Sequence, residues 1–201
     1  MEKRNGFTLV EIAIVLVIIG LLLGGLLKGQ ELIDSARAKS IAQDLRSVSI
    51  AVLSYQDKYR ALPGDDAGAA SRWGPSTCQG DGDGIIEGGS SAPAENQCLW
   101  QHLRLANLIT GDATSLASPK HADGGDFSVF SRAADSPIPE TPGSLIVCAT
   151  NVRGRHIAAF DAMLDDGNPG TGSLRAKPSS PVSVAASGIN ENALYVVCMG
   201  F

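Results

Sequence analysis

The sequence predicts an α+β protein in which one long N-terminal helix precedes a small domain built on an antiparallel β-sheet. Three observations predict this fold class. An apolar run from Ile12 to Leu27 continues into an amphipathic stripe that ends near Leu62. A stretch rich in Gly, Asp, Ser and Pro follows, from residue 63 to about 95. Beyond residue 126, short apolar segments are separated by Gly- and Pro-containing connections, which suit hairpins rather than crossover helices.

The first expected element is a membrane-spanning helix at about residues 7–28. A helix crosses the hydrocarbon core with about 20 apolar residues, and this run is long enough. Lys3 and Arg4 precede it, which by the positive-inside tendency leaves the N-terminus in the cytoplasm and the rest of the chain outside. Two other interpretations are open: a secretory signal cut near Gly24-Gly25, and a plain anchor on a protein that never assembles.

Glu11 is the residue that this anchor does not explain. It lies at the start of the apolar run, where a carboxylate is costly unless something pairs with it. If residues 1–6 were removed, the new α-amino group of Phe7 would lie about one helical turn from Glu11. An amine from the same chain or from a neighbouring copy would then neutralise the carboxylate. Neither a secretory signal nor a plain anchor needs an acidic residue at this position.

The leader Met1–Gly6, the segment Phe7–Glu11 and the apolar run behind them together resemble the class III signal of type IV pilins and type II secretion pseudopilins. The resemblance implies cleavage after Gly6 by a prepilin peptidase, N-methylation of Phe7, and contact of Glu11 with the amine of an adjacent subunit during assembly. It implies a pilin-like fold, single-pass storage in the inner membrane with the head outside, and then a filament. That filament would be a homo-oligomer or a hetero-oligomer with other pilins, at the cell surface or in the periplasm.

The second half of the long helix is amphipathic, and the whole helix is expected over residues 7–62. Pro63-Gly64 ends it. The apolar residues of the stripe are spaced by steps of four and three. They are Ile41, Leu45, Val48, Val52, Tyr55, Tyr59 and Leu62.

The remaining residues, 63–201, are enough for one modest globular head. After the loop-rich segment 63–95, helical spacing of apolar residues predicts a short helix at about 97–110. A β-sheet is expected over about 126–201. Its four candidate strands are Asp126–Ser131, Leu145–Thr150, Ile157–Leu164 and Leu194–Met199.

The four cysteines are Cys78, Cys98, Cys148 and Cys198, and none stands in a C-x-x-C pair. An even number without zinc-type spacing favours disulfides in an oxidising compartment. Three connectivities are possible, and we favour neighbours: Cys78 with Cys98, and Cys148 with Cys198.

The segment Gly80–Glu87 begins with alternating Gly and Asp residues, and two interpretations explain this pattern. Asp81, Asp83 and Glu87 would supply hard oxygens to calcium, as in the front of an EF-hand-like loop. The alternative is an Asp-Gly turn between two cysteines. Asp165 and Asp166 form a second, weaker candidate for calcium, and here the turn is the favoured interpretation.

Charge and motifs narrow the function classes. The formal net charge is −5, and the leader carries one acidic and two basic residues, so the mature chain would be at −6. No basic stripe is present, so a nucleic-acid partner is not expected. The sequence contains no G-x-S-x-G, H-E-x-x-H or P-loop motif, and we expect no enzyme activity. The expected function is a major or minor pilin, with a type II secretion pseudopilin, or an anchored calcium-binding or adhesion module that does not polymerise, as alternatives.

Overall fold

The computed structural model describes residues 8–88, 93–132, 135–179 and 188–201. The chain divides into two compact units, Met1–Ala36 and Arg37–Phe201. Helix α1, Leu9–Tyr59, contributes residues to both units. It ends three residues before the expected boundary because Arg60 has a φ of 58°, a left-handed conformation that terminates helices.

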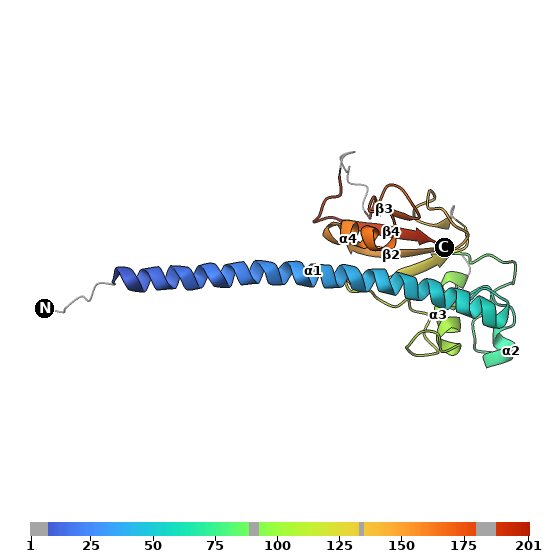
Figure 1. Ribbon diagram of the computed structural model, residues 1–201. Helices are drawn as coiled ribbons and strands as arrows, with labels where there is room; N and C mark the ends of the chain where they lie inside the picture. The colour runs from blue at the N-terminus through green and yellow to red at the C-terminus, as the bar shows by residue number, and fades with distance from the viewer. Residues whose placement is uncertain (1–7, 89–92, 133–134, 180–187) are drawn as a thin grey trace. The chain divides into compact units, whose positions relative to one another are not determined.

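The second unit contains a four-stranded sheet with the order β1-β2-β4-β3, in which every neighbouring pair is antiparallel (Figure 1). The strands are β1 (Phe127–Phe130), β2 (Ile146–Arg153), β3 (Leu174–Pro178) and β4 (Leu194–Gly200). The α+β layout with a long apolar N-terminal helix and a small antiparallel sheet is therefore confirmed.

Each face of the sheet packs a different hydrophobic cluster. Along β2, Val147 and Ala149 belong to the main core, whereas Ile146 and Cys148 belong to a smaller cluster. This alternation follows from the two-residue period of a strand. The main core also takes side chains from α1, from α3 (Glu95–Leu105) and from α4 (Gly154–Leu164). The largest include Leu45, Tyr55, Leu99 and Phe160.

The strand expected at Ile157–Leu164 is wrong: these residues form most of helix α4, which packs on β2 and β3. The buried side chains of this segment are Ile157, Phe160 and Asp161, a spacing of three and four that places them on one face of a helix. The apolar density of the segment suggested a strand, but the segment lacks the alternation that a half-buried strand requires.

Three other features differ from expectation: two elements were not predicted, and one helix has different bounds. The fourth strand of the sheet is β3, a segment with only one fully buried residue, Leu174. The short helix α3 begins at Glu95 and ends at Leu105 rather than spanning 97–110. The loop-rich segment contains one further turn of helix, α2, at Ala69–Trp73.

Both disulfides join the neighbouring cysteines. Cys78 is bonded to Cys98 across a separation of 20 residues, which ties the loop-rich segment to α3. Cys148 is bonded to Cys198, and these two residues are register partners on the adjacent strands β2 and β4. All four cysteines are therefore in disulfides.

Buried polar side chains organise the region after α1. The Tyr55 hydroxyl donates to Asp66 Oδ2 at 2.6 Å, and Arg72 of α2 forms an ion pair with the same carboxylate. Burial raises the pKa of the Tyr55 phenol, so it remains a donor throughout the physiological range. This three-residue contact holds α2 against the end of α1.

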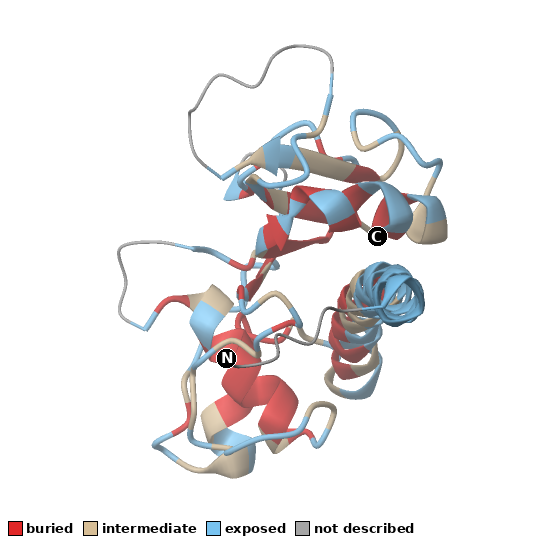
Figure 2. Ribbon diagram, turned by 90° about the vertical axis from the view of Figure 1, so that its left-hand side faces the viewer, coloured by how far each residue is buried: buried red, intermediate tan, exposed pale blue. Residues whose placement is uncertain are grey.

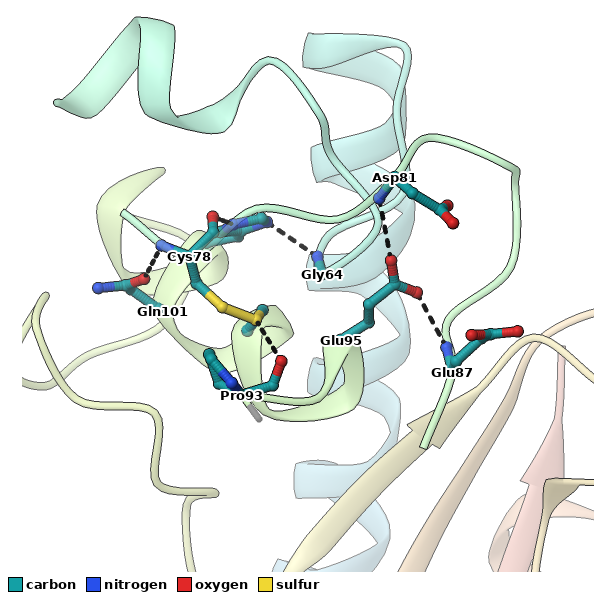
Figure 3. Close-up of a disulfide and its surroundings, with 9 residues drawn as sticks. Gly64, Cys78, Asp81, Glu87, Pro93, Glu95 and Gln101 are labelled. Carbon is teal, nitrogen blue, oxygen red and sulfur yellow. Dashed lines mark hydrogen bonds between the residues drawn. A yellow bond between two sulfur atoms is a disulfide. The ribbon is translucent and has the colours of Figure 1, made fainter. Parts of the chain in front are cut away.

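His102 of α3 connects two other segments of this region. The Gly64 backbone N–H donates to Nδ1 at 2.8 Å, so Nε2 carries the proton and donates to the Cys78 carbonyl at 2.7 Å. The Cys78 N–H in turn donates to Gln101 (Figure 3). Because the ring is fully buried, burial lowers the pKa of His102 and the neutral form is favoured.

We expect part of the free energy of unfolding to depend on the neutral state of His102. Because its pKa is lowered by folding, the unfolded chain binds the proton at higher pH. The stabilisation that depends on neutral His102 is therefore complete above about pH 6.5, and it is lost as the pH falls through the lowered pKa. His102→Gln cannot titrate and should lower the free energy of unfolding by about 1–3 kcal/mol at pH 8.

Urea unfolding of both proteins at pH 8, 7, 6 and 5 measures this effect. The stability difference between wild type and His102→Gln should shrink toward pH 5. A variant that loses stability as steeply as the wild type between pH 7 and pH 5 would contradict the assignment.

Candidate functional site

The described part of the first unit is an apolar helical surface without a covering layer. Large apolar side chains from Leu9 to Ile33 are each close to half exposed or more, and Leu9 reaches 88%. In Figure 2, α1 is seen nearly end-on, and its nearer turns are pale blue, the colour of exposed residues. Over the best 18-residue window the mean hydropathy is 2.8 and no residue is buried. Apolar patches of this extent are normally covered by lipid or by protein.

By length and composition α1 is able to cross a membrane, and it is the one such helix among the described residues. A signal sequence near an N-terminus meets the same criterion. The charged pair Lys28–Glu31, at 2.6 Å, marks the point where the apolar run gives way to polar residues. Because both side chains are largely exposed, this pair adds little stability.

Glu11 forms a capping box with Thr8 at the start of α1. Its Oε2 accepts hydrogen bonds from the Thr8 backbone N–H and from the Thr8 hydroxyl, each at 2.8 Å. The Thr8 hydroxyl oxygen accepts the Glu11 N–H at 3.3 Å. Such reciprocal bonds satisfy backbone donors that the first turn of a helix leaves free.

The capping box gives Glu11 a local role that the expected pairing with an amine did not include. The signal for it is the sequence Thr8-Leu9-Val10-Glu11, which has the S/T-x-x-E spacing of a capping box. The hydrogen bonds satisfy one carboxylate oxygen but leave the negative charge in place. The expected cleavage and methylation sites, Gly6 and Phe7, lie outside the described residues.

Two carboxylates from other segments, Asp65 and Glu95, bind the backbone of the Asp-rich loop, which is the segment Gly80–Glu87. Asp65 accepts the backbone N–H groups of Gly82 and Gly84 at 2.6 and 2.8 Å. Glu95, at the start of α3, accepts those of Asp81 and Glu87 at 3.2 and 3.1 Å (Figure 3). Burial raises the pKa of both Asp65 and Glu95, and the N–H donors oppose that shift.

The structure brings Asp81 and Asp83 together but places Glu87 elsewhere. One oxygen from each of Asp65, Asp81 and Asp83 lies within 4.8 Å of the others. Glu87 instead forms an ion pair with Arg132 at 3.2 Å. The side chains of Asp81 and Asp83 also accept the N–H two residues on, at 3.1 and 2.8 Å, as in Asp-Gly turns. Calcium binding by this loop therefore stays a prediction. The third carboxylate of the candidate site is Asp65, where Glu87 was expected.

Sequence reasoning missed Asp65 and Glu95 because both contacts span many residues. Asp65 lies 17 positions before Gly82, and Glu95 lies 14 positions after Asp81. Local spacing carries no signal for such a contact. The one available hint was the pair of acidic residues directly after Pro63-Gly64.

Two of the three histidines meet near one end of the sheet. His156 Nδ1 pairs with Asp123 Oδ2 at 2.9 Å, and both side chains are buried. His121 donates through Nε2 to the Thr150 carbonyl at 2.7 Å, and its Nδ1 accepts the Asp123 N–H. These contacts position a loop against β2.

The comparison with protein-family models gives one finding. Residues 1–27 match the model of the prokaryotic N-terminal methylation motif. No curated protein and no solved structure matches this chain. The match covers the leader, Glu11 and the apolar run, which are the residues on which the resemblance to pilins depends. The chain therefore carries a type IV pilin-like class III prepilin signal and joins it to a pilin-like α+β layout.

Proposed function

We propose that this chain is a structural subunit, a major or minor pilin, of a type IV pilus-like filament. A prepilin peptidase would cut after Gly6, and Phe7 would then be N-methylated. The chain would wait in the inner membrane as a single-pass protein with its head outside, and would enter the filament through α1. The methylation motif, with Glu11 inside it, is the observation that carries this proposal.

The physical argument starts from the uncovered apolar surface of α1. Each 100 Å² of apolar surface moved out of water is worth about 2.5 kcal/mol, so a helix of this kind does not remain solvated. Lipid covers it before assembly, and identical helices of neighbouring subunits cover it afterwards. Both surroundings are apolar, so burial alone does not decide between them.

Glu11 supplies the difference between the two states. In lipid its charge is offset only by the neutral Thr8 donors. In a filament the amine of a neighbouring Phe7 can approach the free oxygen of the same carboxylate. Because charge pairing is strong in a low-dielectric environment, this contact favours the assembled state and fixes the stagger of neighbouring subunits. The proposed function is accordingly structural, and we propose no catalytic role and no nucleic-acid partner.

A type II secretion pseudopilin uses the same N-terminal segment, so none of the residues above separates it from a pilin. The sizeable head with two disulfides favours a component exposed outside the cell. Shearing cells separates a pilin from the other two possibilities. A pilin is recovered in sheared surface filaments, whereas a pseudopilin and an anchored module remain with the cell envelope.

We expect the mature protein to begin at Phe7 with a methylated amine. Intact-mass and N-terminal peptide mass spectrometry of protein recovered from the membrane measures this. Gly6→Leu, which removes the residue before the cut, should leave the leader attached. A wild-type protein that still begins at Met1, or one trimmed beyond Leu27, would contradict the proposal.

We expect Glu11→Gln to reduce filament yield at least tenfold while leaving cleavage intact. Glutamine retains the capping box but loses the charge. The matched control is Thr8→Val, which removes the cap at a cost of about 1 kcal/mol to the helix but keeps the carboxylate. Its filament yield should fall by about fivefold at most, since 1 kcal/mol is about a fivefold change in an equilibrium constant.

Immunoblots of sheared filaments and of the membrane fraction measure both yields. Normal filament yield from Glu11→Gln would exclude charge pairing as the driving contact. Equal loss from both variants would assign the effect to capping of α1 instead.

A further inference from the structure

Helix α4 ends with a buried carboxylate that no donor satisfies. Asp161 is 0% exposed, and neither of its side-chain oxygens has a hydrogen-bond partner among the described residues. The Gly167 backbone N–H is near enough to lower its pKa somewhat, but it does not reach hydrogen-bonding geometry. Buried carboxylates are normally paired or bound to a metal, because an unpaired buried charge is costly.

Two more carboxylates surround Asp161. One oxygen from each of Asp161, Asp165 and Asp166 lies within 4.8 Å of the others. Calcium binds oxygen at 2.3–2.6 Å, so two ligands of one ion are at most about 5 Å apart. The three oxygens therefore already lie at separations that a single calcium ion can bridge.

The location makes this concentration of negative charge unfavourable without a cation. Asp161 is in the last turn of α4 and Asp165 is its C-cap, which is the negative end of the helix dipole. No basic residue occupies that last turn. Burial is the main cause that raises the pKa of Asp161, to about 6, and the charges of Asp166 and Asp165 add to it.

The neighbouring arginines are directed at backbone oxygens. Arg46 of α1 donates to the Met163 carbonyl at 3.0 Å, and Arg175 of β3 donates to the Gly170 carbonyl. Arg175 acts on Asp166 only through its electrostatic field. The carboxylate of Asp161 is therefore left facing two other acidic side chains.

We propose that Asp161, Asp165 and Asp166 bind a calcium ion that fastens the end of α4 to the start of β3. The ligands are hard carboxylate oxygens without nitrogen or sulfur, the set that calcium prefers. Calcium also tolerates irregular coordination that water and loop carbonyls complete, whereas magnesium demands near-octahedral geometry. This site is separate from the Asp81–Asp83 loop and does not depend on the proposed function.

The connection between α4 and β3 is built around the same side chains. Asp165 Oδ2 accepts the Leu174 N–H at 2.9 Å, and Asp166 accepts the Asn168 N–H and the Thr171 hydroxyl at 2.8 and 2.6 Å. At Gly172 a Cβ atom would lie 1.8 Å from Asp165 Oδ2, so only glycine permits this approach. An ion held here would restrain β3, which is an edge strand of the sheet.

The two acidic clusters of the head differ in the way their buried carboxylate is satisfied. Asp65 already accepts backbone N–H groups from Gly82, Asp83 and Gly84. Asp161 accepts none with hydrogen-bonding geometry. This difference places the ion at the end of α4, and it makes Asp83→Asn the matched control.

The test uses the full-length protein in detergent micelles, treated with chelator and titrated with calcium chloride at pH 7.5. Isothermal calorimetry measures binding, and thermal unfolding measures stabilisation. Calcium at about 100 times its Kd should raise the Tm of the wild type by about 5–10 °C. Asp83→Asn should show the same shift.

Asp161→Asn should bind calcium at least 100-fold more weakly, so that the same calcium concentration raises its Tm by less than about 2 °C. Without calcium it should be at least as stable as the wild type at pH 7.5, because a buried charge has been removed. Asp166→Asn, whose side chain is exposed, gives a second variant that does not alter the core, and it should also weaken binding.

Three results would overturn the proposal. No heat and no Tm shift in the wild type at millimolar calcium would show that the three carboxylates bind no calcium ion. An undiminished response in Asp161→Asn would place the ion elsewhere. Loss of the response in Asp83→Asn but not in Asp161→Asn would assign it to the loop held by Asp65.

Discussion

The constraint on which the structure depends is that the first part of α1 carries far more apolar surface than this chain can cover. From Leu9 to Ile33 the large apolar side chains remain exposed in the described structure. From Ala38 onward the same helix buries one face against the head. A continuous helix of 51 residues therefore changes from a surface that requires lipid or protein copies to one that completes a soluble core.

The head has a modest core, and polar contacts complete it. Asp65, Glu95 and His102 each collect backbone donors or acceptors from segments that have no regular secondary structure. Because an unsatisfied buried N–H or carbonyl costs about 1–3 kcal/mol, these side chains determine the path of the loop-rich segment as firmly as apolar packing determines that of the strands. The Cys78–Cys98 disulfide lies within this network and ties it to α3.

The elements with strong local patterns were predictable from sequence. The apolar run and the stripe from Ile41 to Tyr55 have helical spacing that no tertiary contact overrides. Strands β1, β2 and β4 have apolar residues bounded by turns, and they fall within one to three residues of the predicted ranges at each end. The exceptions have physical causes: α4 was taken for a strand because its apolar residues are dense, and β3 was missed because an edge strand buries little.

The candidate sites also divide into those with a local sequence signal and those that depend on tertiary contacts. Glu11 was recognisable because an acidic residue in an apolar run is a local anomaly, and its bond to Thr8 has a recognisable spacing. Asp65 was not recognisable as the centre of the Asp-rich loop, because the contact joins residues 17 to 19 positions apart. Asp161 was not recognisable as a candidate calcium ligand either. That role depends on its full burial, and burial could not be inferred while its segment was assigned to a strand.

Glu11 and Asp161 share one physical property, which is that each is a carboxylate whose charge no other described residue neutralises. At Glu11 the neutral donors of Thr8 satisfy an oxygen but leave the charge, in a segment destined for apolar surroundings. At Asp161 the described residues supply neither a hydrogen bond nor an ion pair, and two of them add further acidic groups. A folded chain tolerates such charges where a second component arrives to pair with them. In the two proposals, that component is a terminal amine carried by another copy for Glu11, and a calcium ion for Asp161.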